Sequence, residues 1–133
     1  MRPGELGKTL EMPVSHSFDG RMVVMRMEGD YTTGDLKTGV TQALDDPQCP
    51  KDAVLMFDLR QSESIKGRSP AEVQDMANFL AGQRERYSRR LAMVTGSDVA
   101  YGLMRIGAVY VERGGVLPEV FRDFEEAKKW LAP

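Results

Sequence analysis

The sequence has few of the side chains that metal binding, cross-linking and nucleophilic catalysis require. Histidine and cysteine occur once each among 133 residues, as His16 and Cys49. A single cysteine cannot form an internal disulfide, and no further metal ligands stand at suitable spacing from either residue. A Gly-x-Ser-x-Gly elbow and a complete P-loop are also missing. We therefore expect a protein that is not an enzyme and that carries no metal or cofactor.

Strong charge and long apolar runs are missing as well. Twenty acidic and 18 basic residues leave a net charge of −2, so no overall field would attract nucleic acid. No apolar run approaches the roughly 18 residues of a membrane-spanning helix. The first residues lack the apolar core of a secretory signal. Together with the single cysteine, these features predict a cytoplasmic protein without a nucleic-acid partner or a transmembrane segment.

What is present is typical of one globular domain. Apolar residues make up 41% of the chain and charged residues 29%, which is the balance of an ordinary folded protein. Residues 1–13 contain two glycines and two prolines and are expected to form a flexible N-terminal tail. Residues 14–133 are expected to form a single domain.

A β-hairpin is expected at the beginning of that domain. Val14, His16 and Phe18 alternate with polar residues, and a second apolar run begins at Met22. The two runs are separated at Asp19-Gly20, which favours a two-residue type I′ turn.

Strands and helices are then expected to alternate. Thr33 can cap a helix that ends before Pro47, and residues 53–57 form a continuously apolar strand. Such a strand belongs in the middle of a sheet that helices cover on both faces. Further helices are predicted after Ser69-Pro70, over 98–113 and after Asp123, with strands at 91–95 and 119–121. The expected fold is α/β, with about four helices and a mixed, mostly parallel sheet.

This order resembles the STAS fold of anti-sigma-factor antagonists, and most closely the SpoIIAA-like subgroup. Residues 25–35, 54–60 and 120–131 carry the likeness, the last as a short strand followed by a capped helix ending in Ala-x-x-Trp-Leu. In the antagonists, a serine at the start of the helix after the central strand is phosphorylated. Ser69 occupies about that position, although residues 66–70 differ from the Asp-Ser-Ser-Gly-like turn of those proteins.

The resemblance implies a regulatory or binding module that acts through an unidentified protein partner and is switched by phosphorylation of Ser69. Other proteins of the wider fold are regarded as binders of small molecules or lipid tails. A carrier of a small apolar or lipid-like ligand is therefore the alternative interpretation. A weaker third interpretation is a small hydrolase that uses Asp58 with a nearby serine.

The polar residues near the carboxyl ends of the strands are expected to form one binding rim. In open parallel sheets, ligands bind beyond those ends, near the point where the strand order reverses. The helix starts at Ser69 and Ser97 offer free backbone N–H groups there, although either serine could simply cap its helix. The predicted rim consists of Asp30, Tyr31, Asp58, Arg60, Arg68, Thr95 and Ser97.

The helix over 98–113 carries more apolar residues than one buried face needs. One stripe, Val99, Leu103, Ile106 and Tyr110, is expected to face the sheet. The other would then be free to contact a second protomer, which predicts a homodimer. The predicted interface residues are Ala100, Met104, Ala108 and Val111.

Overall fold

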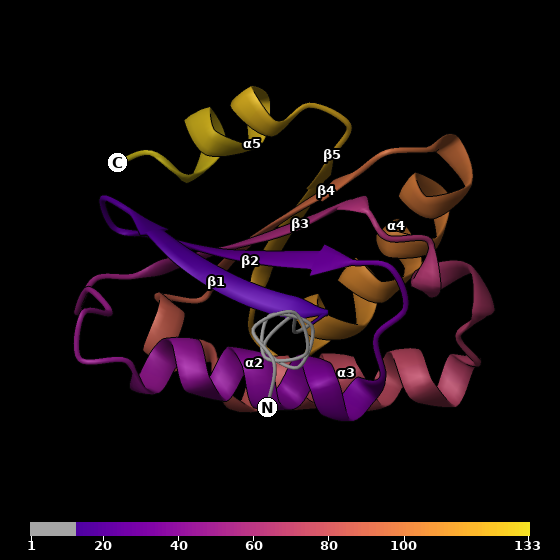
Figure 1. Ribbon diagram of the computed structural model, residues 1–133, viewed down its shortest axis with the longest axis horizontal. Coiled ribbons are helices and arrows are strands. Elements are labelled where there is room, and N and C mark those ends of the chain that lie inside the picture. The colour runs from indigo at the N-terminus through magenta and orange to yellow at the C-terminus, as the bar shows by residue number, and fades with distance from the viewer. Residues whose placement is uncertain (1–12) are drawn as a thin grey trace, which may run out of the picture.

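The computed structural model describes residues 13–133, in which five strands form one sheet that is sandwiched between helices (Figure 1). The predicted flexible tail lies outside the described residues except for Pro13. The carbonyl of Pro13 accepts a hydrogen bond from the Glu28 backbone at 2.9 Å. Within the described part of the chain, no helix has the length and apolar content needed to cross a bilayer.

The strands lie in the sheet in the order in which they occur in the sequence. They are β1 (Val14–Asp19), β2 (Met22–Glu28), β3 (Val54–Gln61), β4 (Arg90–Thr95) and β5 (Leu117–Phe121). β1 pairs antiparallel with β2, whereas the other neighbouring strands are parallel. Residues 54–57 of the apolar run thus belong to the central strand, β3, as the sequence predicts.

Helices cover both faces of the sheet (Figure 1). The helices are α2 (Thr33–Asp45), α3 (Pro70–Gly82), α4 (Asp98–Arg113) and α5 (Phe124–Leu131), with short 3₁₀ turns η1 (Ser64–Gly67) and η2 (Arg84–Tyr87). The strand order never reverses, so crossovers of one hand place α2, α3 and α4 on the same side. We call this side the helix face and the opposite side the α5 face.

Alternation along β3 divides the buried residues into two cores. Leu55 and Phe57 belong to the cluster under α2, α3 and α4. Val54 and Met56 belong to the cluster under α5, where Ala127 is buried. The strand is therefore apolar on both faces because helices cover both of them.

The hairpin forms, but its turn lies one residue later than predicted. Asp19 still pairs with Met22 in the ladder, so the two turn residues are Gly20 and Arg21. Only Gly20 has positive φ, at 60°. Positive φ at the first turn residue alone matches a type II′ turn, and the predicted type I′ turn is wrong.

The first long helix likewise begins at a different cap. Thr32 is the N-cap of α2: its hydroxyl accepts from the Asp35 backbone at 2.9 Å, and the Asp35 carboxylate accepts from the Thr32 backbone at 2.9 Å. This reciprocal pair is a capping box. Thr33, the predicted cap, is the first residue of the helix, because it has no carboxylate three positions later to complete such a pair.

The predicted orientation of α4 is wrong. Ala100, Met104 and Val111 are buried against the core, and Ala108 is partly buried, so the predicted interface faces inward. The exposed apolar residues are Val99, Ile106 and Val109, with exposures of 60%, 55% and 47%. Small residues explain why this side of α4 faces inward, since they let α4 approach α3 closely. A Cβ at Gly107 would lie 3.6 Å from Val73 of α3.

Candidate functional site

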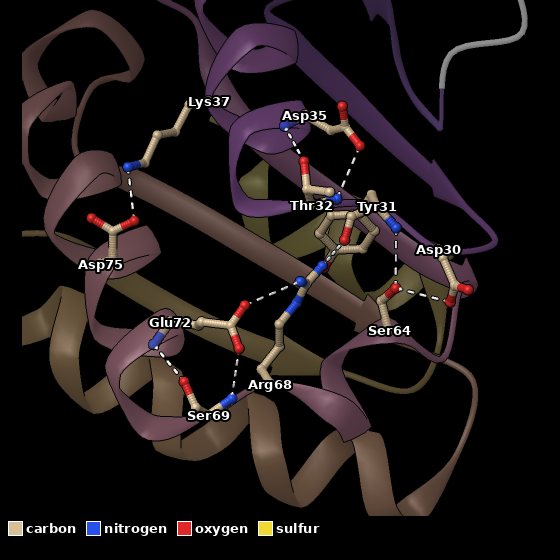
Figure 2. Close-up of polar contacts among 10 residues, drawn as sticks. All are labelled: Asp30, Tyr31, Thr32, Asp35, Lys37, Ser64, Arg68, Ser69, Glu72 and Asp75. Carbon is tan, nitrogen blue, oxygen red and sulfur yellow. Dashed lines mark hydrogen bonds and ion pairs between the residues drawn. The ribbon is translucent and has the colours of Figure 1, made fainter.

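A network of polar contacts joins the loop after β2 to the start of α3 on the helix face (Figure 2). We call this network the Arg68 cluster; its members are Asp30, Tyr31, Ser64, Arg68, Ser69 and Glu72. The loop after β2 supplies the first two residues and η1 supplies Ser64. Arg68 and Ser69 link η1 to α3, and Glu72 lies in the first turn of α3.

Arg68 lies at the centre of the cluster. Its guanidinium lies over the Tyr31 ring, 4.7 Å from the ring centroid, and also donates to the Tyr31 carbonyl. A second guanidinium nitrogen lies 3.6 Å from the Glu72 carboxylate. Only 10% of the Arg68 side chain is exposed, and its Nε has no hydrogen-bond partner among the described residues. Burial raises the pKa of Tyr31, while the charge of Arg68 and its hydrogen bond act in the opposite direction.

Ser69 and Glu72 form a second capping box at the start of α3. The Ser69 hydroxyl accepts from the Glu72 backbone at 3.1 Å, and the Glu72 carboxylate accepts from the Ser69 backbone at 3.0 Å. That backbone hydrogen bond is the main reason why the pKa of Glu72 is lowered. Ser69 is exposed, so its hydroxyl combines a capping role with access from solvent.

Two serines connect the β2 loop to η1. Ser64 accepts from the Tyr31 backbone at 3.1 Å and lies 3.3 Å from an Asp30 carboxylate oxygen. The buried Ser62 donates to the Gly29 carbonyl at 2.5 Å. Neither serine was identified from the sequence. Glu72 was missed too, although Ser-Pro-Ala-Glu at 69–72 has the spacing of a capping box.

A separate charged cluster lies on the α5 face. The buried Asp58 carboxylate accepts two hydrogen bonds from the Arg60 side chain, each at 2.9 Å. Arg26 of β2 lies 3.5 Å from the same carboxylate. The Arg60 guanidinium also lies 4.8 Å from the ring centroid of Phe124 on α5.

These arginines keep Asp58 ionised. Burial acts to raise the pKa of Asp58, but the hydrogen bonds from Arg60, together with the charges of Arg60 and Arg26, outweigh it and lower the pKa. Both carboxylate oxygens already accept hydrogen bonds from guanidinium groups. The side chain is also separated by the sheet from Ser69, so the two residues are not arranged as an acid–base and nucleophile pair.

The remaining predicted rim residues lie at the end of β4. Thr95 is fully buried and its hydroxyl has no hydrogen-bond partner within the described residues. Ser97 is the N-cap of α4 and accepts from the Ala100 backbone at 3.2 Å. The end of β3 adjoins this bend, because a Cβ at Gly96 would lie 3.2 Å from the Arg60 carbonyl.

The predicted rim is therefore three separate groups. Asp30, Tyr31 and Arg68 meet on the helix face, whereas Asp58 and Arg60 point to the α5 face. The side chains of residues 56, 58 and 60 share one face of β3 because strands alternate. Among the five described strands the order also does not reverse, so they form no crevice of the expected type.

His16 and Cys49 have ordinary surroundings. His16 lies 3.2 Å from the carboxylate of Asp46, and Cys49 is a partly buried free thiol. Across residues 13–133, no three histidine, cysteine, aspartate or glutamate side chains are grouped so that they could hold a metal ion.

Comparison with known proteins identifies the fold. No protein-family model and no curated protein matches the sequence. A similar solved structure is that of an uncharacterised protein of the DUF3478 family from Shewanella loihica PV-4, which is described as having a SpoIIAA-like fold. The two chains are 13% identical and superpose with a TM-score of 0.60, over 90% of this chain and 92% of the other. At this identity the likeness establishes the fold alone, and this chain has the SpoIIAA-like α/β fold that its sequence resembles.

Proposed function

We propose that the chain is a non-enzymatic regulatory module that acts as a cytoplasmic homodimer and binds another protein through the Arg68 cluster. Phosphorylation of Ser69 is the proposed switch. The observation that carries this proposal is the exposed hydroxyl of Ser69 at the first turn of α3, joined through Glu72 to the largely buried Arg68.

A phosphate on Ser69 would change the contacts of Arg68. It would add nearly two negative charges beside the Glu72 carboxylate, which already lies 3.6 Å from the guanidinium. Phosphate and carboxylate would repel each other and compete for that one cation, since a phosphate accepts charge-assisted hydrogen bonds strongly. The positive end of α3 would stabilise the phosphate in place. The contacts between Arg68 and Tyr31 would then differ between the phosphorylated and the unphosphorylated protein.

Affinity capture from the native cell tests this proposal, with wild type, Ser69→Asp and Ser69→Ala as bait. Ser15→Asp is the matched control, because Ser15 is another exposed serine but lies on β1. We expect at least one protein whose retention by Ser69→Asp differs from wild type by about tenfold, a difference of about 1.4 kcal/mol in binding free energy. Phosphorylated Ser69 should also be detected by mass spectrometry of the protein from cells. Equal retention of every protein by all four baits would refute the switch.

One observation favours the alternative of an apolar-ligand carrier. An apolar cavity of about 40 Å³ lies between the sheet and the helices, and its lining includes Phe57, Met76, Met93 and Met104. Such a cavity holds only a few water-sized groups, so a lipid chain would require the helices to move. Native mass spectrometry of the purified protein tests this alternative: a co-purified apolar molecule would support it, and a bare chain mass would count against it.

A further inference from the structure

The outward side of α4 carries a line of apolar positions that no described residue covers. Val99, Ile106 and Val109 are all exposed, and the exposed Gly102 lies between them. These four positions are spaced by three, four and three residues, which is the spacing of a seam between two packed helices. We call them the α4 seam.

The α4 seam contains a protrusion and a matching recess one turn apart. Ile106 projects from the helix, whereas the position of a Cβ at Gly102 has no heavy atom within 4 Å. A twofold axis that passes between these two positions would place Ile106 of each copy over Gly102 of the other. The same operation pairs Val99 with Val109. A surface that is complementary to itself in this way is what a symmetric dimer requires.

The charges around the α4 seam also suit a second copy of the chain. Asp98 and Glu112 balance Arg105 and Arg113, so the side chains of α4 itself carry no net charge. Two antiparallel helices would bring the end that carries Asp98 towards the partner end that carries Arg113, and their dipoles would also be opposed. Asp98 also pairs with Arg122 of its own chain, which adds a cation beside that end of the seam.

A groove beside the α4 seam extends the apolar surface to α3. Its volume is about 180 Å³, and it is lined by Ile65, Arg68, Pro70, Val73, Leu103, Ile106 and Tyr110. A stable homodimer buries about 800 Å² on each partner, which is more than one short helical seam supplies. The groove would add to the surface that two copies could bury.

We infer that the α4 seam is the self-association surface of this protein, where α4 of a second copy packs antiparallel with Ile106 in the recess at Gly102. This inference rests on the homodimeric part of the proposed function and does not require phosphorylation of Ser69.

Sedimentation velocity of the full chain, from about 1 to 100 µM, tests the inference. We expect the wild type to form a dimer within this range. Gly102→Leu adds a side chain at a position where a Cβ lies in open space, and it replaces glycine by a good helix former. It should therefore unfold at the same or a higher urea concentration than wild type, yet weaken the dimer by about tenfold or more. Ile106→Glu should abolish the dimer.

Leu117→Glu is the matched control, because Leu117 is 58% exposed but lies on the edge strand β5. It should dimerise as wild type does. A wild type that stays monomeric throughout would overturn both the inference and the proposed homodimer. A dimer that Gly102→Leu leaves intact, or that Leu117→Glu dissociates, would overturn the α4 seam while leaving the homodimer in place. Partner binding at Ser69 is tested separately by the affinity capture, since sedimentation measures the purified chain alone.

Discussion

Replacement of Asp58 by asparagine should separate the electrostatic role of the α5-face cluster from its packing. The asparagine side chain has nearly the size of the aspartate but no charge to attract Arg60 and Arg26. The native carboxylate is only 2% exposed and accepts two hydrogen bonds from Arg60, each at 2.9 Å. We expect the variant to fold and to lose the part of its stability that depends on the charge.

The size of the loss in the free energy of unfolding follows from how exposed Arg60 and Arg26 are. A hydrogen bond to a charged group contributes about 1.5–3 kcal/mol, and loss of its partner is most costly where the remaining group is buried. The side chains of Arg60 and Arg26 are 41% and 43% exposed, so water can solvate both once the carboxylate is gone. We therefore expect a loss of about 2 kcal/mol in the free energy of unfolding, near the lower end of the range. In a chain of this size, that corresponds to a fall of roughly 8 °C in Tm.

Urea unfolding at several pH values measures this loss, with the fluorescence of Trp130 on α5 as the signal. Because the pKa of Asp58 is lowered in the folded state, its charge stabilises the fold above the unfolded pKa, near 3.9. That stabilisation is lost as the pH falls through the folded pKa. The difference between wild type and Asp58→Asn should thus be constant from about pH 7 to pH 5 and shrink below about pH 4.

The exposed Asp52, which lies 3.8 Å from Arg21, supplies the control. Asp52→Asn should change the free energy of unfolding by less than about 0.5 kcal/mol, as exposed ion pairs contribute little. The reasoning would be refuted if Asp58→Asn were as stable as wild type at pH 7, or if its deficit persisted unchanged in acid.

Substitutions at three further positions test local features of the fold by urea unfolding. Ser69→Ala removes the capping hydroxyl of α3 and should cost about 1 kcal/mol, whereas Ser69→Asp keeps a capping oxygen and should be near wild type; equal losses would contradict the cap. Tyr87→Phe removes the buried hydroxyl that donates to the Leu80 carbonyl at 2.6 Å and should also cost about 1 kcal/mol; no loss would mean that the bond is not stabilising. Gly39→Ala puts a Cβ 2.5 Å from Val14 Cγ1 and should cost roughly 2 kcal/mol, but less in a Val14→Ala background; equal costs in both backgrounds would exclude the clash.

The fold was predictable because local signals and burial agree over most of the chain. The stretch Val54–Phe57 is apolar without interruption, and only the centre of a sheet covered on both faces accommodates such a strand. The starts of α3 and α5 are equally easy to predict, because the capping residues Ser69-Pro70 and Asp123 are followed by apolar residues at helical spacing. These features depend on residues close in sequence, for which composition and period are sufficient.

The orientation of α4 was not predictable in that way. Both stripes of the helix are apolar, and periodicity does not say which of two apolar stripes faces the sheet. The choice depends on shape: Ala100, Gly107 and Ala108 allow close approach to the core, whereas Ile106 on that side would hold the helix away. Shape complementarity between distant segments is invisible to a local pattern.

The face of the sheet on which Asp58 lies could, in contrast, have been predicted from the sequence. The residues of β3 alternate between faces, so Asp58 shares the side of Val54 and Met56 and cannot share that of Phe57. What the sequence does not contain is the spatial strand order. The expectation of a single rim depended on a reversal of that order, and β1 to β5 lie in sequence order instead.

Because of this geometry, phosphorylation of Ser69 would act on residues of the helix face. Asp58 and its arginines lie beyond the sheet, so a charge added at Ser69 would act first on Arg68, the nearest largely buried cation. Arg68 covers the Tyr31 ring on one side and lines the groove beside α4 on the other. A change in its contacts would therefore alter a wall of the groove that extends the α4 seam. Partner binding at Ser69 and self-association through α4 would then be coupled through one side chain, and Ser69→Asp should shift the dimer dissociation constant of the wild type.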